Sequence, residues 1–305
     1  MVLFDGHCDT LSRCMEQREG LLCNTGHIDL NRAEQLGTYC QMFAIFANGG
    51  GWEQVCRQYS FFLDEMERNR ERMVQCRTGE QITDAWSRGK MAALLSVEGG
   101  ELLRCDPDLL PAAHAMGVRA INLTWNHANA LSGSCADEPE RGLSPLGKEF
   151  VREMARLGIL VDVSHLSEAG FFDLEEITEK PFVASHSNAK SVFFHRRNLT
   201  NEQITAIISC NGVIGLNLYA GFVGEHPGLE DVIDHAEHIL SLGGERNLAI
   251  GADFDGCETL PRSFRDIRDM ECLREMLLRR GYSEALLDNI FYSNLLRVVS
   301  DVCTM

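Results

Sequence analysis

The sequence predicts one α/β domain with the (β/α)8 fold, a closed barrel of parallel strands surrounded by helices. Eight short apolar runs alternate with segments of helical character, which is the order of elements in such a barrel. Five of these runs are followed within three residues by a histidine of metal-ligand type or a lone carboxylate. Because active sites of these barrels lie at the C-terminal ends of the strands, one edge would gather polar residues that are far apart in sequence.

The expected strands are apolar nearly throughout, as is typical of parallel strands that are covered by helices. They comprise residues 2–4, 39–47, 91–97, 118–125, 159–163, 181–184, 212–219 and 248–252. Amphipathic spacing predicts helices over residues 53–76, 145–157, 201–209, 231–242 and 284–299. Thr200 is the expected N-cap of the third helix, and His235 and His238 are expected on a polar outer face of the fourth.

Length and charge restrict the class of protein. The 305 residues fit one barrel, and no linker divides them, so we expect a single domain over residues 1–305. A formal net charge of −17 disfavours nucleic acid and anionic membrane surfaces as partners. No apolar run reaches the ~18 residues of a transmembrane helix, and the N-terminus looks mature as written. The 12 cysteines include no C-x-x-C pair, which suggests reduced thiols in a cytoplasmic protein.

His7 and Asp9 follow the first strand and form an H-x-D pair. Residues two apart in a strand point the same way, so both side chains can reach one metal ion while Cys8 faces the other side. The pair at His27 and Asp29 has the same spacing, but no apolar run precedes it. We therefore expect Asp29 to be a helix N-cap and the first pair to bind metal.

Four further residues end apolar runs, namely Glu98, His165, His186 and Asp253. Taken singly, each has an ordinary explanation: a solvated loop carboxylate, a buried core histidine or a helix cap. Taken together at equivalent strand ends, they favour a metal site, because a carboxylate after so apolar a run is costly to bury without a cation. Asp255 is better placed than Asp253 to cap a helix.

The combination of imidazole nitrogen and carboxylate oxygen, without thiolate, suits catalytic zinc, with manganese, cobalt or iron as substitutes. Glu98 can bridge two ions through its two oxygens. Two bridged ions would hold a shared hydroxide as nucleophile, which leaves Asp253 to act as general base and acid.

These motifs resemble the membrane (renal) dipeptidase family of metallopeptidases. The matching stretches span nearly the whole chain in the family's order and are DGHCDT at 5–10, SVEG at 96–99, LGILVDVSHLS at 157–167, SHSNA at 185–189, RRN at 196–198, GADFDG at 251–256 and NLLRV at 294–298.

The resemblance implies two zinc ions per chain, one held by His7, Asp9 and Glu98. It places the second zinc on Glu98, His165 and His186. It further implies that Asp253 is the catalytic acid and base. Arg197 would clamp the free carboxylate of a dipeptide substrate, whose C-terminal residue can have the D configuration, and a homodimer is a possible assembly.

The sequence departs from the family's mammalian members in two ways. Trp125 occupies the position of a histidine that contacts substrate there, so that contact passes to His127, passes to Asn129, or is lost. We take His127 as the candidate substrate-binding residue. No lipid-anchor tail follows the last expected helix, which predicts a soluble, cytoplasmic, bacterial-type enzyme.

Two other functions are compatible with parts of the pattern. Another binuclear-metal barrel amidohydrolase would act on a small amide, but such enzymes usually begin with H-x-H and often use a modified lysine as bridge. A metal-binding regulator without turnover would need neither a proton-transferring Asp253 nor an anion-binding Arg197. The sequence therefore favours a dipeptidase.

Overall fold

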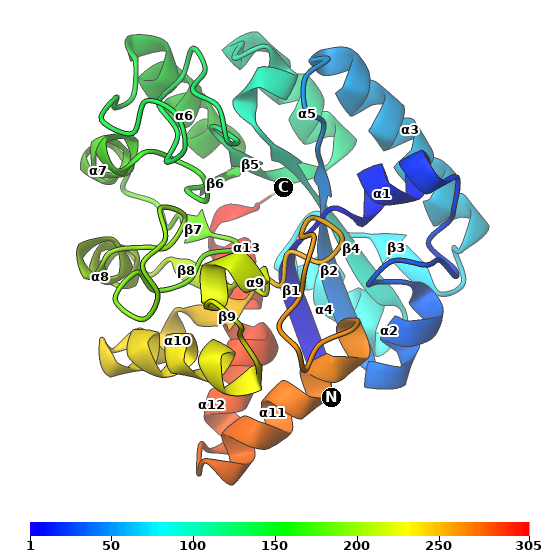
Figure 1. Cartoon of the computed structure of the whole chain (residues 1–305). Helices are drawn as coiled ribbons and strands as arrows, with labels where there is room; N and C mark the ends of the chain where they lie inside the picture. The colour runs from blue at the N-terminus through cyan, green and yellow to red at the C-terminus, as the bar shows by residue number, and fades with distance from the viewer. Residues whose placement is uncertain (305) are drawn as a thin grey trace.

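Nine parallel strands form one sheet in the computed structural model, which describes residues 1–304. The strands are β1 (Val2–Cys8), β2 (Thr38–Ile45), β3 (Met73–Gln75), β4 (Met91–Glu98), β5 (Val118–Asn122), β6 (Leu160–Asp162), β7 (Val183–Ala184), β8 (Val213–Leu216) and β9 (Leu248–Ile250). The sheet closes because β2 pairs with β4 and β1 pairs with β9, which leaves β3 outside the ring. Helices surround this ring of strands (Figure 1), so the predicted (β/α)8 barrel is confirmed.

The extra strand β3 corrects one expected helix. The helix predicted over residues 53–76 is α3 (Trp52–Arg68), which ends before β3 begins. Met73 pairs with Met91 at the start of β4, and β5 pairs with the later part of that strand. Because Met73 is buried and Val74 is exposed, the segment has the alternation of a strand. The apolar spacing of the preceding helix continues into this segment, so the sequence pattern predicted one long helix instead.

The remaining helices connect and cover the strands. Two predicted helices match to the residue, α6 (Pro145–Leu157) and α8 (Asn201–Ser209). Thr200 caps α8 as expected, since its hydroxyl accepts a hydrogen bond from the Gln203 amide at 3.2 Å. The others are α1 (Thr10–Gln17), α2 (Leu30–Leu36), α4 (Gly79–Ser87), α5 (Leu110–Met116), α7 (Glu168–Ile177), α9 (Ala220–Val223), α10 (Leu229–Ser241), α11 (Met270–Arg279), α12 (Glu284–Asp288) and α13 (Asn294–Val302). Within residues 1–304, none of these helices combines the length and the apolar character that crossing a bilayer requires.

His235 on α10 lies in the interior, which corrects the expectation of a polar outer face. Its ring is fully buried, its Nδ1 accepts from the Ala189 amide at 3.1 Å, and its Nε2 lies 3.1 Å from the Val223 carbonyl oxygen. Burial lowers the pKa of His235 to about 4, so the ring is neutral. It fastens the segment after β7 to α9 and α10, a contact that helix periodicity alone does not reveal.

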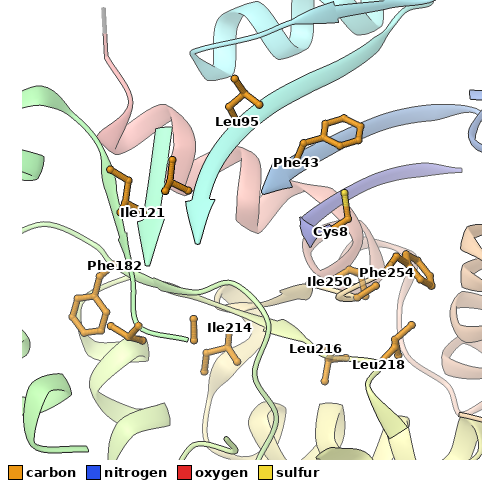
Figure 2. Packing of buried hydrophobic residues seen from close by; sticks show 14 of the residues in the cluster. Cys8, Phe43, Leu95, Ile121, Phe182, Ile214, Leu216, Leu218, Ile250 and Phe254 are labelled. Carbon is orange, nitrogen blue, oxygen red and sulfur yellow. The ribbon is translucent and has the colours of Figure 1, made fainter. Parts of the chain in front are cut away.

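Two apolar layers hold the barrel together. One lies between the strands and the surrounding helices, and Figure 2 shows Cys8, Phe43, Leu95 and Ile121 in it. The other fills the barrel interior with residues from every strand of the ring, packed against Leu295 and Val298 of α13. Most of these interior residues come from the N-terminal or central parts of the strands, so α13 closes the N-terminal end of the barrel.

The opposite, C-terminal end of the barrel interior is polar and tightly packed. A Cβ atom at Gly251 would lie 1.6 Å from the Ser185 carbonyl oxygen, and one at Gly215 would lie 1.9 Å from it. Only glycine therefore fits at these positions, where the chain must pass close to the end of β7. This close approach fixes the backbone immediately before His186.

Candidate metal centre and substrate cleft

The six residues predicted to bind metal or transfer protons meet at the C-terminal end of the barrel. His7 lies in β1 and Glu98 ends β4, whereas the others follow β1, β6, β7 and β9 and are Asp9, His165, His186 and Asp253. Each is no more than 8% exposed. The fold thus brings together residues from five separate parts of the sequence, as the strand-end argument predicts.

One group of donor atoms converges on His7. Its Nε2 lies 3.4 Å from Asp9 Oδ2, 3.7 Å from Glu98 Oε2 and 3.9 Å from Asp253 Oδ1. His7 Nε2 and Asp9 Oδ1 are buried without a hydrogen-bond partner. Burial acts to lower the pKa of His7, but the carboxylates of Glu98, Asp9 and Asp253 outweigh it and raise the pKa to about 10. The negative charge gathered here therefore favours a cation.

A second group converges on the other oxygen of Glu98. Glu98 Oε1 lies 2.9 Å from His165 Nε2 and 3.5 Å from His186 Nε2, and these two nitrogens are 3.1 Å apart. Burial lowers the pKa of both histidines well below the usual value, so both rings are neutral. Asn126 Oδ1 lies 3.0 Å from His165 Nδ1. Since an amide oxygen only accepts, the His165 proton resides on Nδ1 and its Nε2 lone pair faces Glu98.

These groups fit metal ions. A nitrogen lone pair and carboxylate oxygens that face each other in a buried site repel unless a cation lies between them. The donors are nitrogen and oxygen, which suits zinc and related divalent ions. Two sets of atoms lie mutually within 4.8 Å, His7 with Glu98 and His186, and His7 with Asp9 and Asp253. The two oxygens of Glu98 face different donors, so its carboxylate is placed to serve two ions.

Asp253 is held by a residue that the sequence argument missed. Asn217, just after β8, donates from Nδ2 to Asp253 Oδ2 at 3.0 Å. Burial raises the pKa of Asp253 to about 6, within the range that suits a general acid and base near neutral pH. The backbone at Asp253 has a φ of 61°, a strained conformation for a residue other than glycine. The sequence feature that could have indicated this role is that Asn217 is a polar residue inside the apolar run 212–219.

Ser185 is a second positioning group that the sequence argument missed. Its hydroxyl lies 2.7 Å from His186 Nδ1. Together with the contact between Asn126 and His165, it leaves the Nε2 atoms of both histidines directed at Glu98. Such outer contacts fix the orientation of ligand rings in metal sites.

Arg197 is a buried cation beside this centre, only 5% exposed. Its guanidinium donates to Ser187 Oγ at 3.3 Å and to the His186 carbonyl oxygen at 3.1 Å, and it lies 5.3 Å from the Phe222 ring centre. Its Nε has no hydrogen-bond partner, and among residues 1–304 it forms no ion pair. A buried cation without a carboxylate partner is costly, so this position suits the binding of an anion.

The structure does not bring His127 into the centre. His127 is exposed, and its ring centre lies 5.8 Å from that of Trp125. Trp125 and Asn126 line the cleft instead, and Phe46 packs 4.9 Å from Trp125. Asn129 donates to Glu101 and to the Leu123 carbonyl oxygen, which accounts for its side chain. A substrate contact by His127 stays a prediction.

The segment around His27 is structural. Asp29 caps α2, since its side chain accepts from the Arg32 amide at 2.8 Å, as expected. Asp255 caps no helix, which corrects the sequence interpretation. Its carboxylate accepts from Thr10 Oγ1 and from the His27 amide, both at 2.6 Å. It thus ties the loop after β9 to α1 and to the segment before α2.

Two cavities adjoin the metal-type donors and share His165. The main cleft measures 970 Å³ and exposes Asp9, Glu98, Trp125 and Asp253 on its walls. The side pocket measures 440 Å³ and lies between α7, the segment around Cys135 and the loop from β7 to α8. Burial raises the pKa of the Cys135 thiol, whereas Arg197, Arg196 and Lys190 act to lower it. The positive charges of these three side chains therefore influence the electrostatic potential inside the side pocket.

Comparison with known proteins agrees with this geometry. The sequence model of one family, described as membrane dipeptidase (peptidase family M19), matches residues 1–305. The chain belongs to this family. The predicted resemblance is thereby confirmed, and membership supports the class of metallo-dipeptidase hydrolases with a metal-dependent site.

Individual relatives give the same result. An uncharacterised dipeptidase of Schizosaccharomyces pombe is 32% identical over 217 residues, which cover 69% of this chain and 53% of that protein. The chain thus matches about half of the length of this relative. The solved structure of dipeptidase AC, a metallopeptidase, has a TM-score of 0.93 and 28% identity, with 99% of both chains covered. A metallopeptidase of Rhodobacter sphaeroides, solved with a phosphinate mimic of the dipeptide L-Ala-D-Ala, has a TM-score of 0.93 and 26% identity over 99% of both chains.

Proposed function

We propose that this chain is a zinc-dependent dipeptidase that hydrolyses the peptide bond of unblocked dipeptides. The observation that carries this proposal is the buried Arg197, which has no carboxylate partner among residues 1–304, next to converging histidine and carboxylate donors. Arg197 suits a substrate carboxylate, and the histidine and carboxylate donors suit metal ions that act on the neighbouring peptide bond. A C-terminal D-residue is a suitable substrate because the Rhodobacter sphaeroides relative was solved with a mimic of L-Ala-D-Ala.

We assign the metal ligands to two ions that share Glu98. One ion would be held by His7, Asp9 and Glu98, and the other by Glu98, His165 and His186. When bound, such ions polarise the scissile carbonyl and lower the pKa of water. The opposed directions of the two Glu98 oxygens support this division, since each faces a different histidine group.

Asp253 is the proton-transferring residue in this proposal. Its carboxylate accepts a proton from the attacking water and returns it to the leaving amine nitrogen. Asn217 keeps the carboxylate oriented through its bond to Oδ2, and Oδ1 faces His7. The low exposure of Asp253 keeps bulk water from competing for this proton.

The charge distribution along the site fits both ends of an unblocked dipeptide. Arg197 provides a planar donor pair for the C-terminal carboxylate. The main cleft, which Arg197 does not line, has six carboxylate residues but two arginines, Arg13 and Arg57, among its lining residues. Carboxylates there favour the N-terminal ammonium group. The substrate would therefore lie across the metal donors with its two charged ends held in opposite directions.

Metal analysis combined with a dipeptide panel tests this function. We expect about two zinc ions per chain and turnover of L-Ala-L-Ala and L-Ala-D-Ala, whereas N-acetylated dipeptides and dipeptide amides should react slowly. Elemental analysis after dialysis gives the stoichiometry, and ninhydrin detection of free amino acid gives the rate. A protein that binds one ion, or that hydrolyses only other small amides with zinc restored, contradicts the proposal.

Arg197→Ala should raise KM for free-carboxylate dipeptides by about 10- to 100-fold, since a charge-assisted pair contributes about 1.5–3 kcal/mol. The matched control is the same dipeptide as its C-terminal amide, whose KM should change little because it lacks the charged group. Steady-state kinetics on both substrates provides the comparison. An unchanged KM for the free-carboxylate dipeptide would exclude the clamp role.

A further inference from the structure

The side pocket opens beside Arg197 and extends away from the main cleft. His165 is common to both cavities, and Ser187 and Arg197 line the side pocket. A dipeptide with its carboxylate on Arg197 and its scissile bond at the metal donors has its last Cα atom between these groups. The side chain of the C-terminal residue is therefore the part of the substrate nearest to the side pocket.

The walls of this pocket carry more cations than carboxylates, in contrast to the chain as a whole, whose formal net charge is −17. Lys190, Arg196 and Arg197 line it, against Glu140 and Glu168. With Arg197 bound to the backbone carboxylate, Lys190 and Arg196 are left to face a side chain. The Lys190 ammonium is 4.0 Å from Glu168 Oε2, too far for a hydrogen bond, so it keeps donors free for a ligand.

The inner wall of the pocket is apolar. Val163, Leu166, Ala169, Phe172 and Leu199 line it. Val163, Leu166 and Leu199 are buried, and Ala169 is half-buried. This surface suits the methylene groups of a short side chain, whereas the cations suit a charged end group.

We propose that the side pocket selects dipeptides whose C-terminal residue carries an acidic side chain, with Lys190 and Arg196 as the specificity-determining residues. This inference rests on the proposed dipeptidase function and names a substrate class for the same site. Aspartate and glutamate combine a short apolar stem with a carboxylate, which matches both walls of the pocket. Long-range attraction by the two cations also favours entry of a dianionic substrate.

The test compares alanyl-glutamate with alanyl-glutamine, which have the same shape but differ in charge. Both dipeptides have the C-terminal configuration that the enzyme prefers. We expect kcat/KM to be at least about 10-fold higher for alanyl-glutamate, which is the effect of one charge-assisted contact. In the double variant Lys190→Gln/Arg196→Gln this ratio should fall toward one. Glu168→Gln, which removes the opposing carboxylate near Lys190, should raise the ratio. Arg152→Gln, at an exposed position on α6, is the matched control and should leave the ratio unchanged.

The outcomes separate this inference from the function on which it rests. Equal kcat/KM for the two dipeptides in the native enzyme, or a ratio that persists in the double variant, overturns the acidic specificity and leaves the dipeptidase function intact. If neither dipeptide is hydrolysed by the zinc-loaded protein, the proposed dipeptidase function and the proposed acidic specificity are both wrong. A binding measurement in the Asp253→Asn background should reproduce the ratio as a difference in dissociation constant, without turnover.

Discussion

Asp253→Asn is expected to lower kcat by about 10²- to 10⁴-fold, the usual contribution of a general acid and base, with two metal ions still bound. Asparagine has nearly the same shape, and its side-chain oxygen can still accept the hydrogen bond from Asn217. It cannot take up a proton from water or return one to an amine. The variant should therefore lose the proton transfer and keep the architecture of the site.

Kinetics and elemental analysis of the same preparation check this expectation. KM should change far less than kcat, because Arg197 and the ligand residues remain. The other possibility is explicit in the geometry, since Asp253 Oδ1 belongs to a donor set with His7 and Asp9. Loss of one ion in the variant would show that Asp253 is a ligand and that the acid–base assignment is wrong.

The strand ends explain why so much of the centre could be predicted from the sequence. In a parallel barrel, an apolar run fixes the strand, and a histidine or carboxylate within the next two positions then lies at the active edge. This rule identifies His165, His186 and Asp253 without any relative. Arg197 follows β7 by more than a dozen residues and has no local pattern, so only the family motif indicated it. Its burial against Ser187 and Phe222 depends on the path of a loop.

The residues that orient the centre could not be predicted, because their roles depend on contacts between loops. In the sequence, three of these residues look like ordinary polar residues: Asn126, Ser185 and Asn217. Asn126 contacts His165 and Asn217 contacts Asp253, both at the end of another strand, whereas Ser185 contacts the adjacent His186. The same limit explains His235, where helical periodicity predicted a polar face. The loop after β7 covers that face through the Ala189 amide, a contact that is invisible in the helix sequence.

Glu98→Gln is expected to remove metal from both sites, with a loss of affinity above about 100-fold, because even outer contacts of metal ligands account for 10- to 100-fold. The Glu98 carboxylate is the group that faces His7 with one oxygen and His165 and His186 with the other. An amide keeps one neutral oxygen and turns its nitrogen donors toward the remaining atoms. It thus removes the negative charge that both ions share.

The native protein should be stabilised by zinc by about 2.7 kcal/mol for each site at a free concentration 100 times Kd, whereas the variant should show almost no rise in Tm. Thermal unfolding over a zinc series measures this difference without any need for catalytic activity. Glu101→Gln is the matched control, since Glu101 lies three residues later, accepts from Asn129 at 2.8 Å and belongs to neither donor set. If the Glu98 variant still binds one ion as tightly as the native chain, Glu98 serves a single ion, and the other site is held by the remaining histidine and carboxylate donors.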